Sequence, residues 1–238
     1  MGRSKLALQL LLLATIAAAA PAGHGAKSGA SKGDAGTHSA MAPDVKALVD
    51  RMQAFYEKTT DFIASFQQQY TYKTFNRTQT SNGKVTFLKP AMMRWEYEKP
   101  TAKTFVLSGD KVYAYDPEAM TMTISGIKTN ELSASVTFLW GVGRLEKEFS
   151  IARQPCASCK GVLLELTPLR QDPRFQKVQL EVDPKTAQVL KSVVVDPDGS
   201  ENAIAFSELK TGQGVAKDRF KIDPPPDTQV IDLTKAQK

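Results

Sequence analysis

The most distinctive candidates for side-chain chemistry are two cysteines in the sequence Cys156-Ala157-Ser158-Cys159. A redox role for such a pair needs a thioredoxin-like βαβ context, which the flanking short strand patterns do not provide. A zinc site needs two further ligands, and the chain offers no other cysteine and no suitably placed histidine. In an exported protein, we therefore expect a local disulfide between Cys156 and Cys159. It would close only a small loop and contribute little entropic stabilisation.

The two histidines, His24 and His38, both precede the segment that we expect to fold, which starts near Asp44. Ser-His-Asp and Cys-His catalytic arrangements, and histidine metal sites, are therefore impossible in the folded part. The chain also lacks a P-loop, a GxGxxG sequence and an HExxH sequence. Counting carboxylates does not rule out a glycosidase-type pair, but none stands out. We expect no enzymatic activity, no catalytic residue, no cofactor and no metal.

The first 26 residues have the pattern of a secretory signal peptide. Arg3 and Lys5 precede an apolar run from Leu6 to Ala20, and small residues allow cleavage near Ala20 or Ala26. The run is short for a membrane span, which needs about 20 apolar residues, so an uncleaved anchor is the less favoured alternative. No cysteine lies near the cleavage region to carry a lipid. We therefore expect an exported, soluble protein.

Residues 27–43 are rich in Gly, Ala and Ser, and we interpret them as a flexible leader. Residues 44–238 are expected to form a single domain, since 238 residues are too few for a large multi-domain enzyme. The formal net charge is +6, and the first 43 residues account for half of it. The folded part is only mildly basic, which is weak evidence for a nucleic-acid partner.

Helical periodicity predicts one helix over Asp44–Tyr56, with Asp44 as its N-cap. The period then changes to two, which is typical of half-buried antiparallel strands. A second, short amphipathic helix is predicted over Glu131–Trp140. We expect about eleven short strands in one curved sheet or barrel. They are Phe62–Tyr72, Lys84–Lys89, Met93–Tyr97, Thr104–Leu107, Lys111–Asp116, Thr121–Ile124, Glu148–Arg153, Val162–Thr167, Lys177–Val182, Val189–Asp196 and Asn202–Leu209.

The sheet has an apolar stripe that permits two interpretations. In the first, it is an ordinary packed core closed by the helices. In the second, it lines a cavity for an apolar ligand, because so many strands enclose more volume than their own side chains easily fill. The predicted helix at Glu131–Trp140 would then be a lid, and flexible Met93 would suit a ligand of variable shape. The candidate ligand-binding residues are Val85, Phe87, Lys89, Met93, Trp95, Tyr97, Tyr113 and Tyr115 on the sheet, and Leu132, Val136, Leu139 and Trp140 on the lid.

Four motifs in order resemble the LolA family of periplasmic outer-membrane lipoprotein carriers. Each is weak alone, but together they span nearly all of Asp44–Asp232. They are Phe62-Ile63-Ala64-Ser65-Phe66-Gln67; Gly83 and Phe87 through Lys89-Pro90 to Arg94-Trp95-Glu96-Tyr97 and Pro100; Ser108-Gly109-Asp110-Lys111 with Tyr113, Tyr115, Asp116 and Pro117; and Phe220-Lys221-Ile222-Asp223-Pro224-Pro225 with Val230 and Asp232.

The resemblance implies a mostly β fold, an unclosed antiparallel barrel covered by an N-terminal helix and a short helical lid. It implies a periplasmic protein that accepts lipoprotein acyl chains from an inner-membrane ABC transporter and passes them to an outer-membrane receptor. The implied chemistry is binding only, by a monomer. Family members often carry an arginine at the position of Lys89, where it helps to hold the lid closed. Lysine cannot make the same planar, bidentate contact, so the latch is expected to differ.

Three other functions compete with a lipoprotein carrier. A carrier of another lipid or glycolipid could use the same scaffold, because a fold does not fix its ligand. An envelope sensor that detects mislocalised lipoproteins would need a second domain through which to signal. An enzyme is disfavoured by the absence of a catalytic constellation. The missing lipid-attachment cysteine favours the carrier over the receptor that shares its fold in the family.

Overall fold

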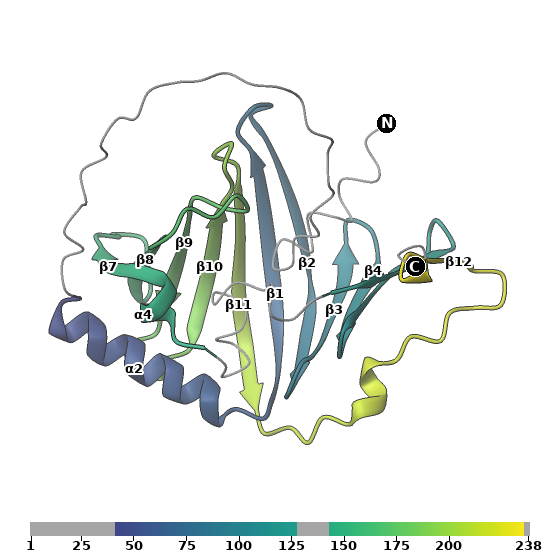
Figure 1. Ribbon diagram of the computed structural model, residues 1–238, viewed down its shortest axis with the longest axis horizontal. Coiled ribbons are helices and arrows are strands. Elements are labelled where there is room, and N and C mark those ends of the chain that lie inside the picture. The colour runs from purple at the N-terminus through teal and green to yellow at the C-terminus, as the bar shows by residue number, and fades with distance from the viewer. Residues whose placement is uncertain (1–40, 128–142, 236–238) are drawn as a thin grey trace.

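The computed structural model describes residues 41–127 and 143–235, and it is dominated by one curved sheet (Figure 1). The predicted signal peptide, the predicted leader up to residue 40 and the predicted lid helix lie outside the described residues, and Pro43, the last residue of the predicted leader, is the first residue of a helix. The elements are α2 Pro43–Lys58, β1 Asp61–Tyr72, β2 Arg77–Leu88, β3 Met92–Lys99, β4 Lys103–Ser108, β5 Lys111–Asp116, β6 Thr121–Gly126, α4 Leu145–Glu148, β7 Phe149–Gln154, β8 Val162–Pro168, β9 Lys177–Val182, β10 Val189–Val195, β11 Glu201–Thr211, η3 Lys217–Phe220 and β12 Gln229–Asp232.

The described strands form a single sheet in the order β12-β6-β5-β4-β3-β2-β1-β11-β10-β9-β8-β7. Its two end strands, β12 and β7, do not pair with each other, so the barrel is unclosed as predicted. The sheet has twelve strands rather than about eleven, because β12 was not expected. Its pairing with β6 is parallel, whereas every other strand pair is antiparallel. Four residues after a proline-rich stretch are too short to show an alternating pattern.

The first described helix, α2, begins one residue before the prediction. Its N-cap position is Ala42, no side chain caps it, and Pro43 and Asp44 both lie in the first turn. The predicted N-cap role of Asp44 is therefore wrong. Proline suits this position because its fixed φ is already helical and its missing N–H would have no helical partner. Asp44 instead places a negative charge near the positive end of the helix dipole.

The strand register gives the sheet two faces with different coverings. Residues directly opposite each other on paired strands share a face, which carries Phe66 with Phe206, Phe87 with Met93, and Trp95 with Phe105. We call this the inner face. Continued across β11, β10 and β9, the same face carries Ile204, Ser192 and Leu180.

Helix α2 covers the part of the inner face formed by β7–β10. Its apolar stripe, including Leu48, Val49 and Met52, forms one core cluster with strand residues such as Leu164 and Leu180. Tyr56, near the end of the helix, is almost fully buried, and its hydroxyl accepts a hydrogen bond from the Val189 backbone N–H at 3.2 Å. Burial raises the pKa of Tyr56 to about 12, so the hydroxyl stays protonated.

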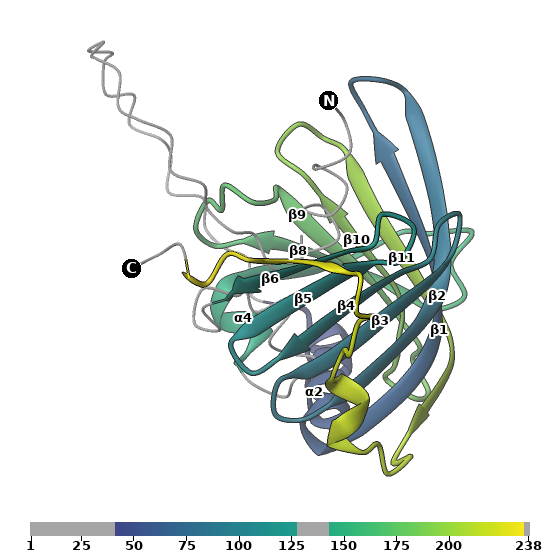
Figure 2. The same ribbon diagram turned by 90° about the vertical axis from the view of Figure 1, so that its right-hand side faces the viewer.

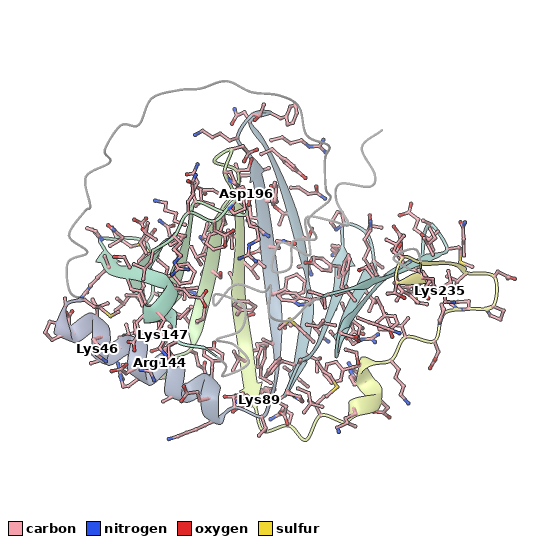
Figure 3. The ribbon with its side chains drawn as sticks, viewed as in Figure 1. Lys46, Lys89, Arg144, Lys147, Asp196 and Lys235 are labelled. Atoms are coloured by element: carbon pink, nitrogen blue, oxygen red, sulfur yellow. A yellow bond between two sulfur atoms is a disulfide. The ribbon has the colours of Figure 1, made fainter. Side chains whose placement is uncertain are left out.

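Lys89 fixes the far end of α2 to the sheet. Directly after β2, its Nζ donates hydrogen bonds to the backbone oxygens of Tyr56 at 3.0 Å and Glu57 at 2.6 Å. The carbonyls in the last turn of a helix have no helical partners and carry partial negative charge, so an ammonium group satisfies both needs. Figure 3 shows Lys89 where the end of α2 meets the lower edge of the sheet.

A second core cluster occupies the inner face over β1–β4, with aromatic contacts across the strands. Phe62 stacks on Phe87 with ring centroids 5.1 Å apart, and Phe66 meets Tyr97 edge to face at 4.8 Å. Gly83 lies between Phe66 and Tyr97 in the register, so these rings pack over a position without a side chain. A Cβ there would overlap the backbone oxygen of Glu96.

The C-terminal segment covers the opposite, outer face of β3 and β4 (Figure 2). Arg94 points to this face, and its Nη1 donates to the backbone oxygens of Arg219 and Lys221, both at 3.2 Å. Phe220, between them, is buried. The carboxylate of Asp61 holds the start of the segment by accepting backbone N–H groups from Gln213 at 2.6 Å and Gly214 at 3.1 Å.

Gly83→Ala is expected to lower the free energy of unfolding by about 1–3 kcal/mol, because the new methyl group must displace strand β3. Urea denaturation measures the change. Gly126→Ala is the matched control, since a Cβ at Gly126 meets nothing closer than 3.9 Å. Equal stability of the two variants would contradict the close approach of β2 and β3.

Lys89→Met is expected to lower the free energy of unfolding by about 1–2 kcal/mol, because two carbonyls at the end of α2 lose a charged donor. The control is Lys58→Met, which removes an exposed lysine from the last turn of α2, the turn that Lys89 binds. Chemical denaturation followed by circular dichroism compares them. If Lys58→Met were as destabilising, the specific role of Lys89 would be refuted.

Candidate functional site

The apolar inner face over β1–β5 is the candidate site, because its described covering is incomplete. No α2 residue belongs to the core cluster on these strands, whereas α2 supplies a large share of the cluster over β7–β10. Phe87 and Met93 are buried there, but Trp95 and Phe206 next to them remain partly exposed. Leu107 and Ala114 are also partly exposed against the same cluster. A half-covered apolar patch of this kind favours contact with another apolar surface.

Five of the residues predicted from the apolar stripe share the inner face. Val85, Phe87, Met93 and Tyr97 are buried, and Trp95 is half-buried. The indole of Trp95 packs edge to face on Phe66, with centroids 4.9 Å apart. Because each of these residues alternates with a polar neighbour on β2 or β3, the period of two was sufficient to group them.

Tyr113 and Tyr115 lie on the outer face, which corrects their placement among the cavity residues. Tyr113 pairs with Val106 and Tyr115 with Thr104, whereas the inner-face residue Phe105 pairs with Ala114. The two tyrosines were predicted as an aromatic pair, and such a pair does not show which face of the sheet it occupies. The inner-face positions of β5 are instead the smaller Val112 and Ala114, which pair with Leu107 and Phe105.

Lys89 does not extend the apolar stripe, because it follows the last residue of β2 and its ammonium group binds the end of α2. Burial lowers the pKa of Lys89, while the nearby Glu57 carboxylate acts in the opposite direction. Any contact between Lys89 and the predicted lid concerns residues outside the described part. The lid candidates Leu132, Val136, Leu139 and Trp140 lie there as well.

The inner face becomes polar toward the other end of the sheet, which the sequence reasoning missed. Gln68 and Asn202 are buried on this face, and Gln68 Nε2 donates to Asn202 Oδ1 at 2.8 Å. One step further, the Tyr70 hydroxyl donates to Asp196 Oδ2 at 2.6 Å. The one sequence feature that could have indicated this polar end was Gln68, a polar residue among the otherwise apolar residues that alternate along β1. Asp196 stands in a turn sequence, Asp196-Pro197-Asp198-Gly199, that gave no hint of burial.

Asp196 has a raised pKa, chiefly because its side chain is buried. Burial raises its pKa most strongly, the Tyr70 hydrogen bond lowers it, and the negative charge of Asp198 raises it. Its Oδ1 atom is buried without a hydrogen-bond partner. Figure 3 shows Asp196 at the upper end of the sheet, far from Lys89 at the lower end. The inner face is thus apolar between two polar ends.

Cys156 and Cys159 form a disulfide in the connection between β7 and β8. The loop is held from β9, because Glu181 Oε1 accepts the backbone N–H groups of Lys160 at 2.6 Å and Gly161 at 2.9 Å. Residues of this loop line a pocket of about 290 Å³, and a second pocket of about 330 Å³ lies beside Phe175. Both lie away from the apolar patch on β1–β5. No cluster in the described part could bind a metal ion.

Asp196→Asn is expected to remove a pH dependence of stability. The folded state binds the Asp196 proton more tightly than the unfolded chain, so this group stabilises the fold fully below the unfolded pKa. That contribution is lost as the pH rises from about 4 through the raised folded pKa. Relative to Asp196→Asn, the parent should therefore become less stable as pH rises from about 4 to about 7. Urea unfolding at each pH measures this, with Glu201→Gln as an exposed control. A constant difference would contradict the raised pKa.

Comparisons with known proteins identify the family to which the chain belongs. The model of the family "Outer membrane lipoprotein carrier protein LolA" matches residues 57–223. A protein from Dechloromonas aromatica (strain RCB), named outer-membrane lipoprotein carrier protein, is 26% identical over 184 residues, which are 77% of this chain and 86% of that protein. One of the same name from Xanthomonas campestris pv. campestris (strain B100) is 29% identical over 167 residues, covering 70% and 79%.

A solved structure supports the fold independently. The crystal structure of an uncharacterized conserved protein from Thermus thermophilus aligns with a TM-score of 0.51 at 16% identity, covering 79% of this chain and 98% of that one. In the described part of this chain, no helix combines the length and apolarity needed to cross a bilayer. The family match spans well over half of the chain, including β1–β5 and their apolar patch. The chain therefore belongs to the LolA family of outer-membrane lipoprotein carrier proteins.

Proposed function

We propose that this protein is a periplasmic carrier that binds the acyl chains of lipoproteins on the inner face of β1–β5. It takes them from an inner-membrane ABC transporter and delivers them to an outer-membrane acceptor. The observation that carries the proposal is the half-covered apolar patch around Trp95, in a chain whose relatives are named lipoprotein carriers. The activity is binding and release, without a chemical step.

The physical problem that such a carrier solves is the exposure of hydrocarbon to water. Each methylene of an acyl chain gains about 0.8 kcal/mol when it leaves water for an apolar environment. Several acyl chains therefore require an extended apolar surface. The exposed parts of Trp95, Leu107 and Phe206 supply it beside the buried Phe87 and Met93. Methionine has a flexible, polarizable side chain that adapts to chains of different shape.

The binding surface of the proposal consists of inner-face residues only. It includes Val85, Phe87, Met93, Trp95 and Tyr97, with Phe105 and Leu107 from β4 extending it. Release is favoured if part of this surface returns to contact with the protein itself when the ligand leaves. The partial exposure of Trp95, Leu107 and Phe206 fits a surface that either the ligand or another part of the protein can cover.

Trp95→Glu is expected to reduce retention of acylated ligand at least about tenfold, because a carboxylate against hydrocarbon loses its hydration. The matched control is Tyr113→Glu, which places the same charge on the outer face of a nearby strand. Native mass spectrometry and lipid extraction of both proteins, purified from a bacterial periplasm, measure the retained ligand.

The retained ligands distinguish a lipoprotein carrier from a carrier of another lipid and from a protein without this binding surface. Lipoprotein bound to the parent and to Tyr113→Glu, but not to Trp95→Glu, is the expected result. Phospholipid or glycolipid bound instead would reject lipoproteins as the ligand and keep the surface. Equal loss in both variants, or an empty parent that excludes hydrophobic dyes, would reject the binding surface itself.

A further inference from the structure

The turn between β1 and β2 carries a phenylalanine, Phe75, whose side chain is largely exposed. Phe75 is 77% exposed, the largest exposure among the described large apolar residues. It lies in the turn from Lys73 to Asn76, which is closed by a hydrogen bond from the Asn76 N–H to the Lys73 oxygen at 3.3 Å. Asn76 adopts a positive φ of 44°, which asparagine tolerates well. The turn geometry thus accounts for Asn76 but gives no reason for a phenylalanine.

On the side of β3, the hairpin formed by β1 and β2 extends beyond the sheet. β1 and β2 stay paired up to Tyr72 and Arg77, but β3 reaches only as far as Asn82 of β2. Residues 77–81 therefore extend about 17 Å of strand beyond β3. Figure 1 shows this hairpin as the projection at the top of the sheet. On its other edge, β1 stays paired with β11 up to Thr71, and the Lys73 N–H donates to the Ser200 hydroxyl at 3.2 Å, so the hairpin is held almost up to its tip.

Two cations flank Phe75 without ion-pair partners in the described part of the chain. Lys73 and Arg77 are both exposed, and no carboxylate lies within 4.0 Å of either charged group. The Lys73 side chain lies over Gly199 of the β10–β11 turn, which also carries Asp196 and Asp198. Asp196 Oδ2 accepts the hydrogen bond of the Tyr70 hydroxyl, and Asp198 Oδ1 accepts the Ser200 N–H at 2.8 Å.

We propose that the tip from Lys73 to Arg77 is a membrane contact, in which Phe75 enters the interface of an anionic bilayer and the two cations bind lipid headgroups. An aromatic ring carried between lysine and arginine matches the layered polarity of that interface. Anionic lipids attract basic groups near the surface, and two groups give weak, reversible binding.

This tip lies at the polar end of the inner face. Tyr70 and Tyr72 on β1 lead directly to it, and Gln68 lies one step further down the same face. A bilayer touched by Phe75 would therefore face the end of the sheet opposite to Lys89. The membrane contact does not rest on the proposed function, because it requires no particular ligand on the inner face.

Vesicle binding of the full chain tests this inference. Phosphatidylglycerol vesicles should sediment the parent protein at low ionic strength, and phosphatidylcholine vesicles should not. Phe75→Ser should weaken binding about tenfold, and Lys73→Ala or Arg77→Ala about fivefold each. Val230→Ser and Lys111→Ala, at an exposed apolar and an exposed basic position elsewhere, are the controls and should bind like the parent.

A Phe75→Trp variant reports insertion directly. Its added fluorescence should shift to the blue and be quenched by brominated phosphatidylglycerol, whereas Val230→Trp should show neither change. Loss of binding in the charge variants alone, with Phe75→Ser unchanged, would overturn insertion. Failure of the parent to bind anionic vesicles, or equal losses in Phe75→Ser and Val230→Ser, would overturn the membrane contact and leave a protein partner as the occupant of the tip.

Discussion

An unclosed sheet with one apolar face is stable only if something other than the sheet covers that face. A closed barrel buries its interior by itself, but here β7 and β12 end the sheet without meeting. Helix α2 covers the β7–β10 part and is held at its end by Tyr56 and Lys89. Within the described residues, the β1–β5 part packs on its own aromatic side chains and on Phe206 of β11, and Trp95 and Phe206 remain partly exposed. The location of the proposed binding surface follows from this unequal covering.

Interactions on the outer face allow the inner face to remain adaptable. The C-terminal segment is anchored by Asp61 at one end and by Arg94 over β3, and Phe220 is buried between its polar contacts. These contacts stabilise β3 and β4 from behind without using any inner-face side chain. Gly83 brings β2 and β3 close together on the inner side. Strand β3 is therefore held firmly even where Trp95 is not fully packed.

Most of this architecture could be predicted from the sequence, because the strands show their alternating pattern within a few consecutive residues. Alternation on β2 and β3 grouped Val85, Phe87, Met93 and Trp95 correctly, since a period of two on neighbouring strands needs only the right register. The assignment failed for Tyr113 and Tyr115, where large aromatic residues occupy the outer face and small ones the inner face. It also missed β12 and the buried Tyr70–Asp196 pair. Those features depend on contacts between segments far apart in the chain, and no local period reports them.

Photo-crosslinking tests most directly whether acyl chains bind on the inner face of β1–β5. A diacylated or triacylated lipopeptide with a photoreactive group in an acyl chain would be loaded on the full chain, irradiated, digested and mapped by mass spectrometry. Crosslinks concentrated on peptides containing Phe87, Met93, Trp95 and Leu107 are the predicted result, with residue-level assignment to inner-face positions. Crosslinks at Tyr113 and Tyr115 on the outer face, or spread evenly over both faces, would contradict the account.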